Sequence, residues 1–255
     1  MTSSRSDYCQ TILAVVIVTL FSTSAIAAKH EGDYLYKVTT VRAATGHLSD
    51  LLDWMKELQA TNYYQDSGQP RPLVMRHSQG DQWDLLIIIP MDSWQAYYQK
   101  SAIERRKHAS QLFSGTLSKE SALIAFAEDH FAYGPPLSTL QSAFDANAFF
   151  HIEMFEAAAG KSAELLEQRR MENNYLAATG QTTNMIFHRA AGSDVDVFTI
   201  GFHKSLAAFA APADVTNEEK DAAAKSAGFK GLADLSFYLR SLISGHHDTL
   251  AVKVD

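Results

Sequence analysis

The chain repeats itself, and this constrains its fold more than any other feature of the sequence. Asn62-Tyr63 followed by Gly68-Gln69 recurs 112 residues later as Asn174-Tyr175 followed by Gly180-Gln181. At this spacing nine residues are identical over the 36 positions from Asn62 to Tyr97. Upstream the spacing becomes 114, because the second copy lacks two residues inside one helix. Such a period indicates a duplicated unit of about a hundred residues.

Both copies show the same order of predicted elements. Each begins with a run of β-branched and aromatic residues that predicts a strand, at 34–42 and 149–155. An amphipathic helix follows, and then a hairpin whose loop contains a glycine at a position that needs a positive φ, Gly80 or Gly192. Further helices are expected at 119–128, 218–227 and 232–243, and a closing strand at 249–254 is clear only in the second copy.

Residues that both copies keep are best explained by a shared requirement of the fold. Asp84 and Asp196 form one such pair. Asn62 and Asn174 form another, and we expect them at equivalent helix ends, with their side chains bonded to the backbone. In a fused repeat, function is expected where the two copies differ.

The order β-α-β-β-α-β is that of the split βαβ, ferredoxin-like unit. Two such units in tandem, over residues 34–254, resemble the dimeric α/β-barrel superfamily, and most of all its NIPSNAP-type and related branches. The resemblance implies an α+β chain whose repeats, 34–147 and 148–255, form one pseudo-twofold barrel with extra helices. The first copy departs from the pattern because it lacks a clear fourth strand.

The first 27 residues read as a secretory signal. An apolar run follows Arg5 and ends in Ala25-Ile26-Ala27, which predicts cleavage after Ala27 and a periplasmic or secreted protein. After cleavage no membrane segment is expected. The net charge of −7 argues against nucleic acid as a partner, and the protein is expected to be a monomer or a homodimer.

Candidate catalytic residues lie where the second copy differs from the first. His151 and Glu153 share one face of a predicted strand, and His188 lies on a neighbouring strand. A histidine beside a carboxylate is typical of proton abstraction. The same side chains could instead hold a metal ion, or be partly exposed residues near a barrel rim.

The superfamily resemblance implies a small-molecule ligand inside the barrel, where Arg76, Trp83 and His203 are expected to contact it. The leading hypothesis is a protein that binds a small hydrophobic or aromatic molecule, with or without transforming it, and uses no cofactor. A non-catalytic binding or stress-associated module is the competing hypothesis.

No metal ligand and no cofactor is predicted. The run His246-His247-Asp248 does not predict a metal site, because adjacent residues of a loop or strand point apart and cannot readily share an ion. We expect this run in a surface loop. Haem remains an alternative, because some superfamily members bind it, although the GxxDG motif of dye-decolourising peroxidases does not occur here. No motif of serine hydrolysis, dinucleotide binding or a P-loop occurs either.

Overall fold

The structure of the chain is a computed structural model that describes residues 32–254. The predicted signal segment, residues 1–27, lies outside the described residues. Eight strands carry the fold: β1 (Tyr34–Ala43), β2 (Leu73–Gln79), β3 (Leu85–Asp92), β4 (Ile124–Gly134), β5 (Phe149–Ala157), β6 (Asn184–Ala191), β7 (Val197–His203) and β8 (Ile243–Lys253).

The strands form one closed barrel in the order β1-β3-β2-β8-β5-β7-β6-β4. Each half of the chain therefore contributes four antiparallel strands in the same order, β4-β1-β3-β2 and β8-β5-β7-β6. The halves are joined where β2 pairs with β8 and where β4 pairs with β6. The predicted tandem of ferredoxin-like units in one barrel is confirmed.

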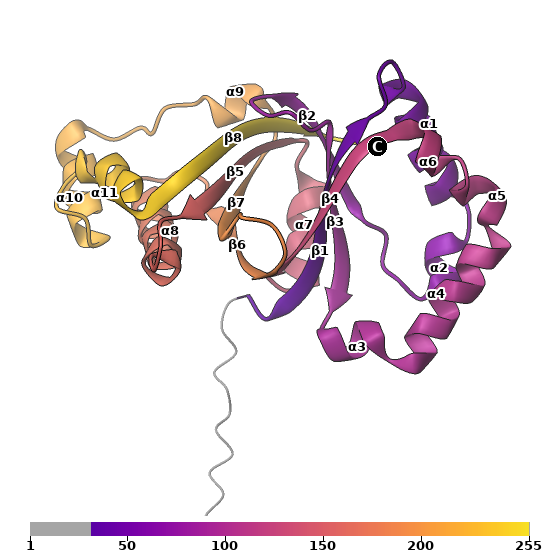
Figure 1. The fold of residues 1–255 in the computed structure, drawn as a ribbon. Helices are drawn as coiled ribbons and strands as arrows, with labels where there is room; N and C mark the ends of the chain where they lie inside the picture. The colour runs from indigo at the N-terminus through magenta and orange to yellow at the C-terminus, as the bar shows by residue number, and fades with distance from the viewer. Residues whose placement is uncertain (1–31, 255) are drawn as a thin grey trace, which may run out of the picture.

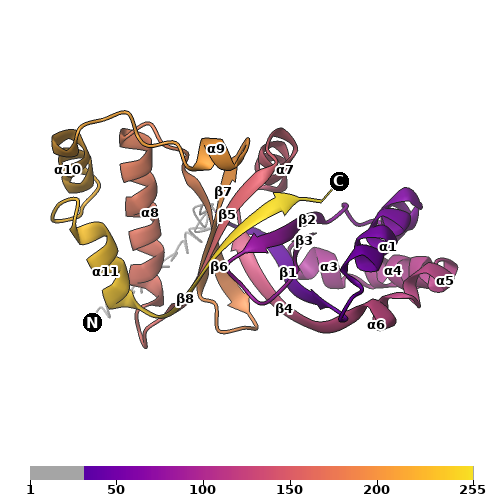
Figure 2. The ribbon, with the colours of Figure 1, turned by 90° about the horizontal axis from the view of Figure 1, so that it is seen from above.

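The helices of the two halves flank the barrel on opposite sides (Figures 1 and 2). Those of the first half are α1 (Leu48–Ala60), α2 (Tyr63–Ser67), α3 (Trp94–Tyr98), α4 (Lys100–Leu112), α5 (Ser114–Leu117) and α6 (Glu120–Leu123). Those of the second half are α8 (Ser162–Ala178), α9 (Leu206–Phe209), α10 (Asn217–Ser226) and α11 (Asp234–Leu242), and α7 (Leu137–Ala146) connects the halves. Within residues 32–254, no helix combines the length and the apolar character that a membrane span needs.

The first half does have a fourth strand, so the prediction of a helix at 119–128 holds only for the short helix α6 and was wrong from residue 124 on. After the short helix α6, the chain enters β4, which pairs with β1 from Tyr34 to Ala43. The segment is rich in alanine and glutamate, which favour a helix locally. Pairing with β1 on one side and with β6 on the other overrides that preference.

The aspartates kept in both copies have equivalent roles. Asp84 accepts a hydrogen bond from the backbone N–H of Ala43 at 2.8 Å, and Asp196 accepts one from Ala157 at 2.9 Å. Each carboxylate thereby satisfies the backbone where the first strand of its half ends. The prediction of a shared fold requirement is confirmed for this pair.

The asparagines behave differently. Asn62 precedes α2, but its side chain makes no capping hydrogen bond, whereas Asn174 lies inside α8. The prediction of equivalent helix ends was therefore wrong. The two residues that only the first copy contains fall where its helix is interrupted between α1 and α2, while α8 runs on without a break.

The middle of the barrel is filled by its own side chains. The rings of Phe187 and Phe198 stack with their centroids 4.5 Å apart, and Tyr36 meets the edge of Phe187. At one end α7 covers the barrel, because Phe144 stacks on Phe150. In the middle of the barrel the strands close tightly enough for large apolar side chains to interdigitate. At the other end a cavity remains, lined in part by Trp83 and Met154 of this core.

Candidate functional site

His151 and Glu153 lie on the outer face of the barrel, beneath the helices of the second half. In β5 the alternate residues Phe150, Ile152 and Met154 belong to the barrel core, so strand alternation turns their neighbours outward. The prediction that His151 and Glu153 share one face is confirmed. The sequence alone does not say which way this face looks; in the structure it looks onto the helices, because the apolar residues of β5 occupy the barrel interior.

A cavity of about 460 Å³ lies over this face of the sheet. It is formed by β5, β6 and β7 below, by α8 at one side, and by α9 with the segment that follows it. The residues that line it are His151, Glu153, Glu172, Leu176, Gly180, Gln181, Thr182, Asn184, His203, Ala208, Phe209, Ala211, Pro212, Ala213 and Asp214.

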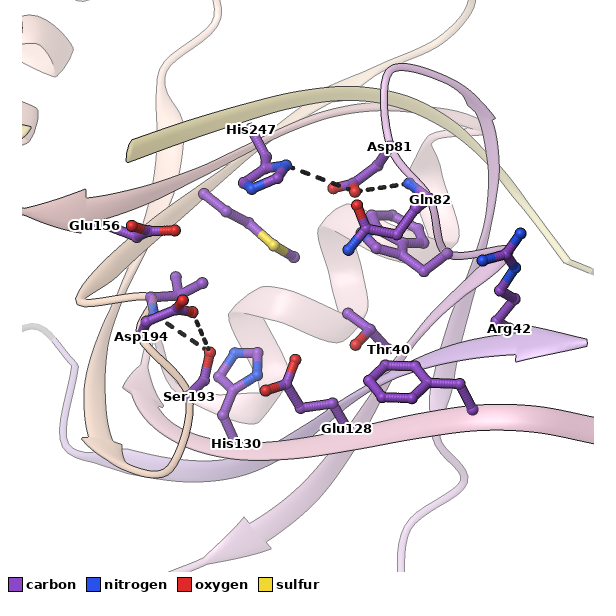
Figure 3. A pocket seen from close by; sticks show the side chains of 14 residues that line it. Thr40, Arg42, Asp81, Gln82, Glu128, His130, Glu156, Ser193, Asp194 and His247 are labelled. Carbon is purple, nitrogen blue, oxygen red and sulfur yellow. Dashed lines mark hydrogen bonds and ion pairs between the residues drawn. The ribbon is translucent and has the colours of Figure 1, made fainter. Parts of the chain in front are cut away.

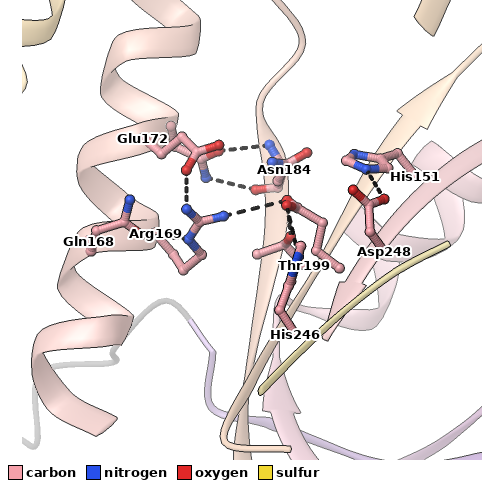
Figure 4. A network of polar contacts seen from close by, with 10 residues as sticks. His151, Gln168, Arg169, Glu172, Asn184, Thr199, His246 and Asp248 are labelled. Atoms are coloured by element: carbon pink, nitrogen blue, oxygen red, sulfur yellow. Dashed lines mark hydrogen bonds and ion pairs between the residues drawn. The ribbon is translucent and has the colours of Figure 1, made fainter. Parts of the chain in front are cut away.

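Asp248 holds His151 at the wall of this cavity. The Nε2 atom of His151 lies 2.7 Å from Oδ1 of Asp248, and the imidazole is 18% exposed (Figure 4). Asp248 belongs to β8 and pairs with Glu153, so the prediction of a surface loop at 246–248 was wrong. Alternation in the strand turns His246 and Asp248 outward and His247 toward the barrel mouth.

The pKa of His151 is raised above its ordinary value. Burial alone would lower it, but the hydrogen bond to Asp248 and the negative charges of Glu153 and Glu172 outweigh burial. The same bond lowers the pKa of Asp248. His151 is therefore biased toward the imidazolium form.

A buried arginine organises the carboxylates beside His151. Arg169 of α8 is 2% exposed and places its guanidinium between Glu153, at 3.4 Å, and Glu172 (Figure 4). Burial raises the pKa of Glu153, but nearby His246, with Nε2 3.6 Å from Oε1, and the charge of Arg169 outweigh burial, so the net shift is downward. For Glu172 burial prevails and the pKa is raised.

A second histidine, His203, also lines the cavity, and its pKa is shifted in the opposite direction to that of His151. Burial and the nearby charge of His151 lower its pKa. The position between the two rings is a glycine: Gly201 pairs with His151 across the β5–β7 ladder, and a Cβ there would lie 2.9 Å from Nε2 of His203. The ring of Phe209 contacts both histidines, with centroid distances of 4.9 and 5.3 Å.

Three of these groups could also hold a metal ion. Ligand atoms of His151, Glu153 and Asp248 all lie within 4.8 Å of one another. In the structure as it stands these groups satisfy one another, because Arg169 neutralises Glu153 and Asp248 bonds His151. An ion would have to compete with both contacts.

The structure brings His151, Glu153 and His203 together and places the other predicted site residues elsewhere. His188 lies against Tyr133, with the rings 5.5 Å apart, because Asn184 and not His188 is the residue of β6 that faces Gly201. The two residues are four positions apart, which corresponds to about 13 Å of strand. Arg76 lies on β2 of the first half, and Trp83 lies at the barrel mouth.

Sequence reasoning missed Asp248, Glu172 and Phe209 as members of this site. Asp248 was missed because its histidine neighbours suggested a loop. The sequence did hold one signal. Asp248 and His246 are two residues apart, so in an extended strand their side chains lie on the same face. Glu172 and Phe209 are brought in only by the packing of α8 and α9 on the sheet.

No family model matches the chain, and no curated protein matches its sequence. Solved structures match in fold. An anthrone oxidase-like protein superposes with a TM-score of 0.55 at 13% identity, over 88% of this chain and 93% of that one. A proposed monooxygenase from Fusobacterium nucleatum subsp. nucleatum gives a TM-score of 0.50 at 10% identity, over 87% and 93%.

A chlorite dismutase mutant from Candidatus Nitrospira defluvii gives a TM-score of 0.48 at 12% identity, over 88% of this chain and 91% of that one. Identities this low establish the fold alone. Together with the strand order, these superpositions show the fold of the chain: two tandem ferredoxin-like units closed into one α/β barrel.

Proposed function

We propose that the second half of the chain binds a small hydrophobic or aromatic molecule in its helix-side cavity and transfers a proton without a cofactor. One observation carries this proposal. Two histidines line the same cavity, and their surroundings shift their pKa values in opposite directions, upward for His151 and downward for His203. Titratable groups separated in this way are typical of an acid and a base that work as a pair.

The proposed chemistry follows from the protonation states. At neutral pH the imidazole of His203 is neutral and can accept a proton from an acidic C–H or O–H group of the ligand. His151 keeps its proton more readily and can stabilise the anion that results. Asp248 orients His151, as a carboxylate does behind a catalytic histidine.

The lining of this cavity is mixed, with more polar than apolar surface, which suits a small ring that carries polar groups. Leu176, Phe209 and Pro212 face the cavity beside the polar groups. One protein of similar fold is described as anthrone oxidase-like and another as a proposed monooxygenase, which agrees with chemistry on a small aromatic molecule. The lining favours such a ligand over haem, since the two propionates of haem would meet no Lys or Arg side chain there.

Proton transfer can be measured directly with anthrone as a probe. We expect the protein to accelerate exchange of the methylene protons of anthrone in D₂O, followed by ¹H NMR, and His203→Gln to reduce the acceleration about a hundredfold. His188→Gln is the matched control and should leave it unchanged, because His188 lies outside the cavity. Equal exchange by wild type and His203→Gln would contradict the assignment of the base.

A binding module without chemistry is the competing function, and the packed barrel interior favours it. The exchange experiment separates the two. Binding of anthrone that perturbs the ring signals of His151 and His203, with no acceleration of exchange, would identify the module.

The pairing of His151 with Asp248 makes a prediction about titration. We expect His151 to titrate above 6.5 in ¹H–¹⁵N NMR spectra, and Asp248→Asn to lower its pKa because the bond and the charge are both lost. Asp129 pairs with Thr39 as Asp248 pairs with Glu153, so Asp129→Asn is the matched control in the first half. An unchanged pKa in Asp248→Asn would show that the pair does not form in solution.

We also propose that the protein is exported and that it belongs to a particular branch of proteins with this fold. The signal-like segment supports a periplasmic or secreted protein, and the duplication supports a place in the NIPSNAP-like or a related branch. The small-molecule site needs neither nucleic acid nor membrane, and a monomer or homodimer suffices. Mass spectrometry of the exported protein should find Ala28 as the first residue; an intact residue 1 would contradict cleavage.

A further inference from the structure

A second cavity opens at the barrel mouth, at the end away from α7. Its volume is about 440 Å³, and both halves contribute to it (Figure 3). The residues that line it are Thr40, Arg42, Asp81, Gln82, Trp83, Phe126, Glu128, His130, Met154, Glu156, Ser193, Asp194, Val195 and His247. We call this cavity the mouth cavity.

Both hairpin loops of the chain contribute to the mouth cavity. The loop after β2 brings Asp81 of the first half to His247 of β8, with Oδ1 and Nδ1 3.6 Å apart. The loop after β6 brings Asp194 of the second half into electrostatic contact with His130 of β4. Each half thus supplies a carboxylate to a histidine of the other half.

His130 is the observation that points to a ligand. It is 3% exposed, and its Nε2 atom has no hydrogen-bond partner among the described residues. Burial lowers its pKa to about 4, against the opposing effect of Asp129 and Asp194, so the ring is neutral at physiological pH. With its proton on Nδ1, the ring presents Nε2 as a buried acceptor, and such an atom is costly to leave without a donor.

The charges around the cavity specify the donor. Four carboxylates line it, those of Asp81, Glu128, Glu156 and Asp194, whereas Arg42 is the one Lys or Arg among the lining residues. The ring of Trp83 and the thioether of Met154, which are 4% and 5% exposed, supply apolar walls. Carboxylates beside an aromatic ring are suited to an organic cation with an alkyl chain.

We propose that the mouth cavity binds a small protonated alkylamine of the polyamine class. One ammonium group donates to Nε2 of His130, the others lie among the four carboxylates, and the methylene chain packs on Trp83 and Met154. A metal ion is less suited to this cavity. Within residues 32–254, the side chains close enough to share an ion are His151, Glu153 and Asp248, in the helix-side cavity.

The probe for this proposal is spermidine, titrated into the full chain by calorimetry at about 0.15 M salt, where exposed charges are largely screened. We expect saturable binding to one site. Combining Glu128→Gln with Asp194→Asn should weaken it at least tenfold, because two of the four carboxylates are lost. Glu167→Gln, an exposed carboxylate of α8, is the control and should leave binding unchanged.

The variant His130→Phe tests whether spermidine binds at a specific site or is only attracted by the negative charge of the cavity. It removes the acceptor atom Nε2 and keeps the four carboxylates. We expect it to weaken spermidine binding, and 1,8-octanediol, which lacks the charges, not to bind. Should His130→Phe fail to fold, the Glu128 and Asp194 variant still decides, since both residues are exposed. Unchanged affinity for spermidine in the Glu128→Gln, Asp194→Asn double variant, or tighter binding of Mg²⁺ than of spermidine to the wild type, would overturn the proposal.

Discussion

Replacing Arg169 by methionine will lower the free energy of unfolding by about 3–5 kcal/mol, because it leaves buried carboxylates without their cation. Arg169 is 2% exposed, and it contacts Glu153 at 3.4 Å, Glu172, and Gln168 at 2.7 Å. Its guanidinium also lies over the ring of Phe155, 4.5 Å from the centroid. Methionine fills much of the same volume, so charge and hydrogen bonds are the main losses. Denaturant unfolding measures the change.

The neighbouring residue provides the control. Arg170 pairs with Glu167 on the surface of α8, with side chains 43% and 61% exposed, so Arg170→Met should cost less than about 0.5 kcal/mol. Adding Glu153→Gln to Arg169→Met should recover part of the loss, because it removes one unpaired charge. A cost below about 1 kcal/mol for Arg169→Met would contradict the role of Arg169 as the buried counterion of this site.

The cost of Arg169→Met should also depend on pH. The folded-state pKa of Glu153 is lowered, so its contribution to stability is present above the unfolded value of 4.5 and is lost as pH falls through the folded value. Protonated Glu153 needs no cation. The difference in stability between wild type and Arg169→Met should therefore shrink as pH falls from the folded-state pKa of Glu153 in the variant to its lower value in the wild type.

Replacing Gly80 by alanine will lower stability by about 3–5 kcal/mol, the combined cost of backbone strain and a close contact. Gly80 has a φ of 112°, and a Cβ there would lie 2.0 Å from the carbonyl oxygen of Asp248. That oxygen belongs to the backbone of β8, so the contact can be relieved only by moving backbone, either of β8 or of the loop that carries Gly80. In molecules that fold, the shift should also reach the bond between Asp248 and His151 and lower the pKa of His151.

The internal repeat supplies the matched control for Gly80. Gly192 occupies the equivalent loop with a φ of 75°, and a Cβ there would lie 3.0 Å from the carbonyl oxygen of Asp129. We expect Gly192→Ala to cost about 1–2 kcal/mol, the cost of a left-handed alanine. Equal losses in the two variants would show that the packing of the first loop on β8 is not tighter than that of its counterpart.

Much of the architecture could be predicted, because it depends on short-range sequence signals and these occur in both copies of the repeat. The glycines at the hairpin loops mark positions of positive φ, and Asp84 and Asp196 recur because each binds the backbone at the end of a strand. The sequence of β3 also agrees with this fold, because the apolar residues Leu86 and Ile88 enter the barrel core while Leu85 packs against the helices. The strand β4 could not be predicted, because its partners β1 and β6 are distant in the chain.

By itself, the sequence determined that the chain is a duplicated α+β unit, and that His151 and Glu153 share a strand face while Ile152 takes the other. Only the tertiary structure decided which face meets the helices, and that His203, Asp248 and Arg169 meet there. The reason is physical. Alternation along a strand is a property of adjacent residues, but both faces of this sheet are covered, so burial alone does not distinguish them. The contacts of β5 with β7 and β8, and of Glu153 with Arg169 of α8, join segments that are separated along the chain and form only when the second half folds.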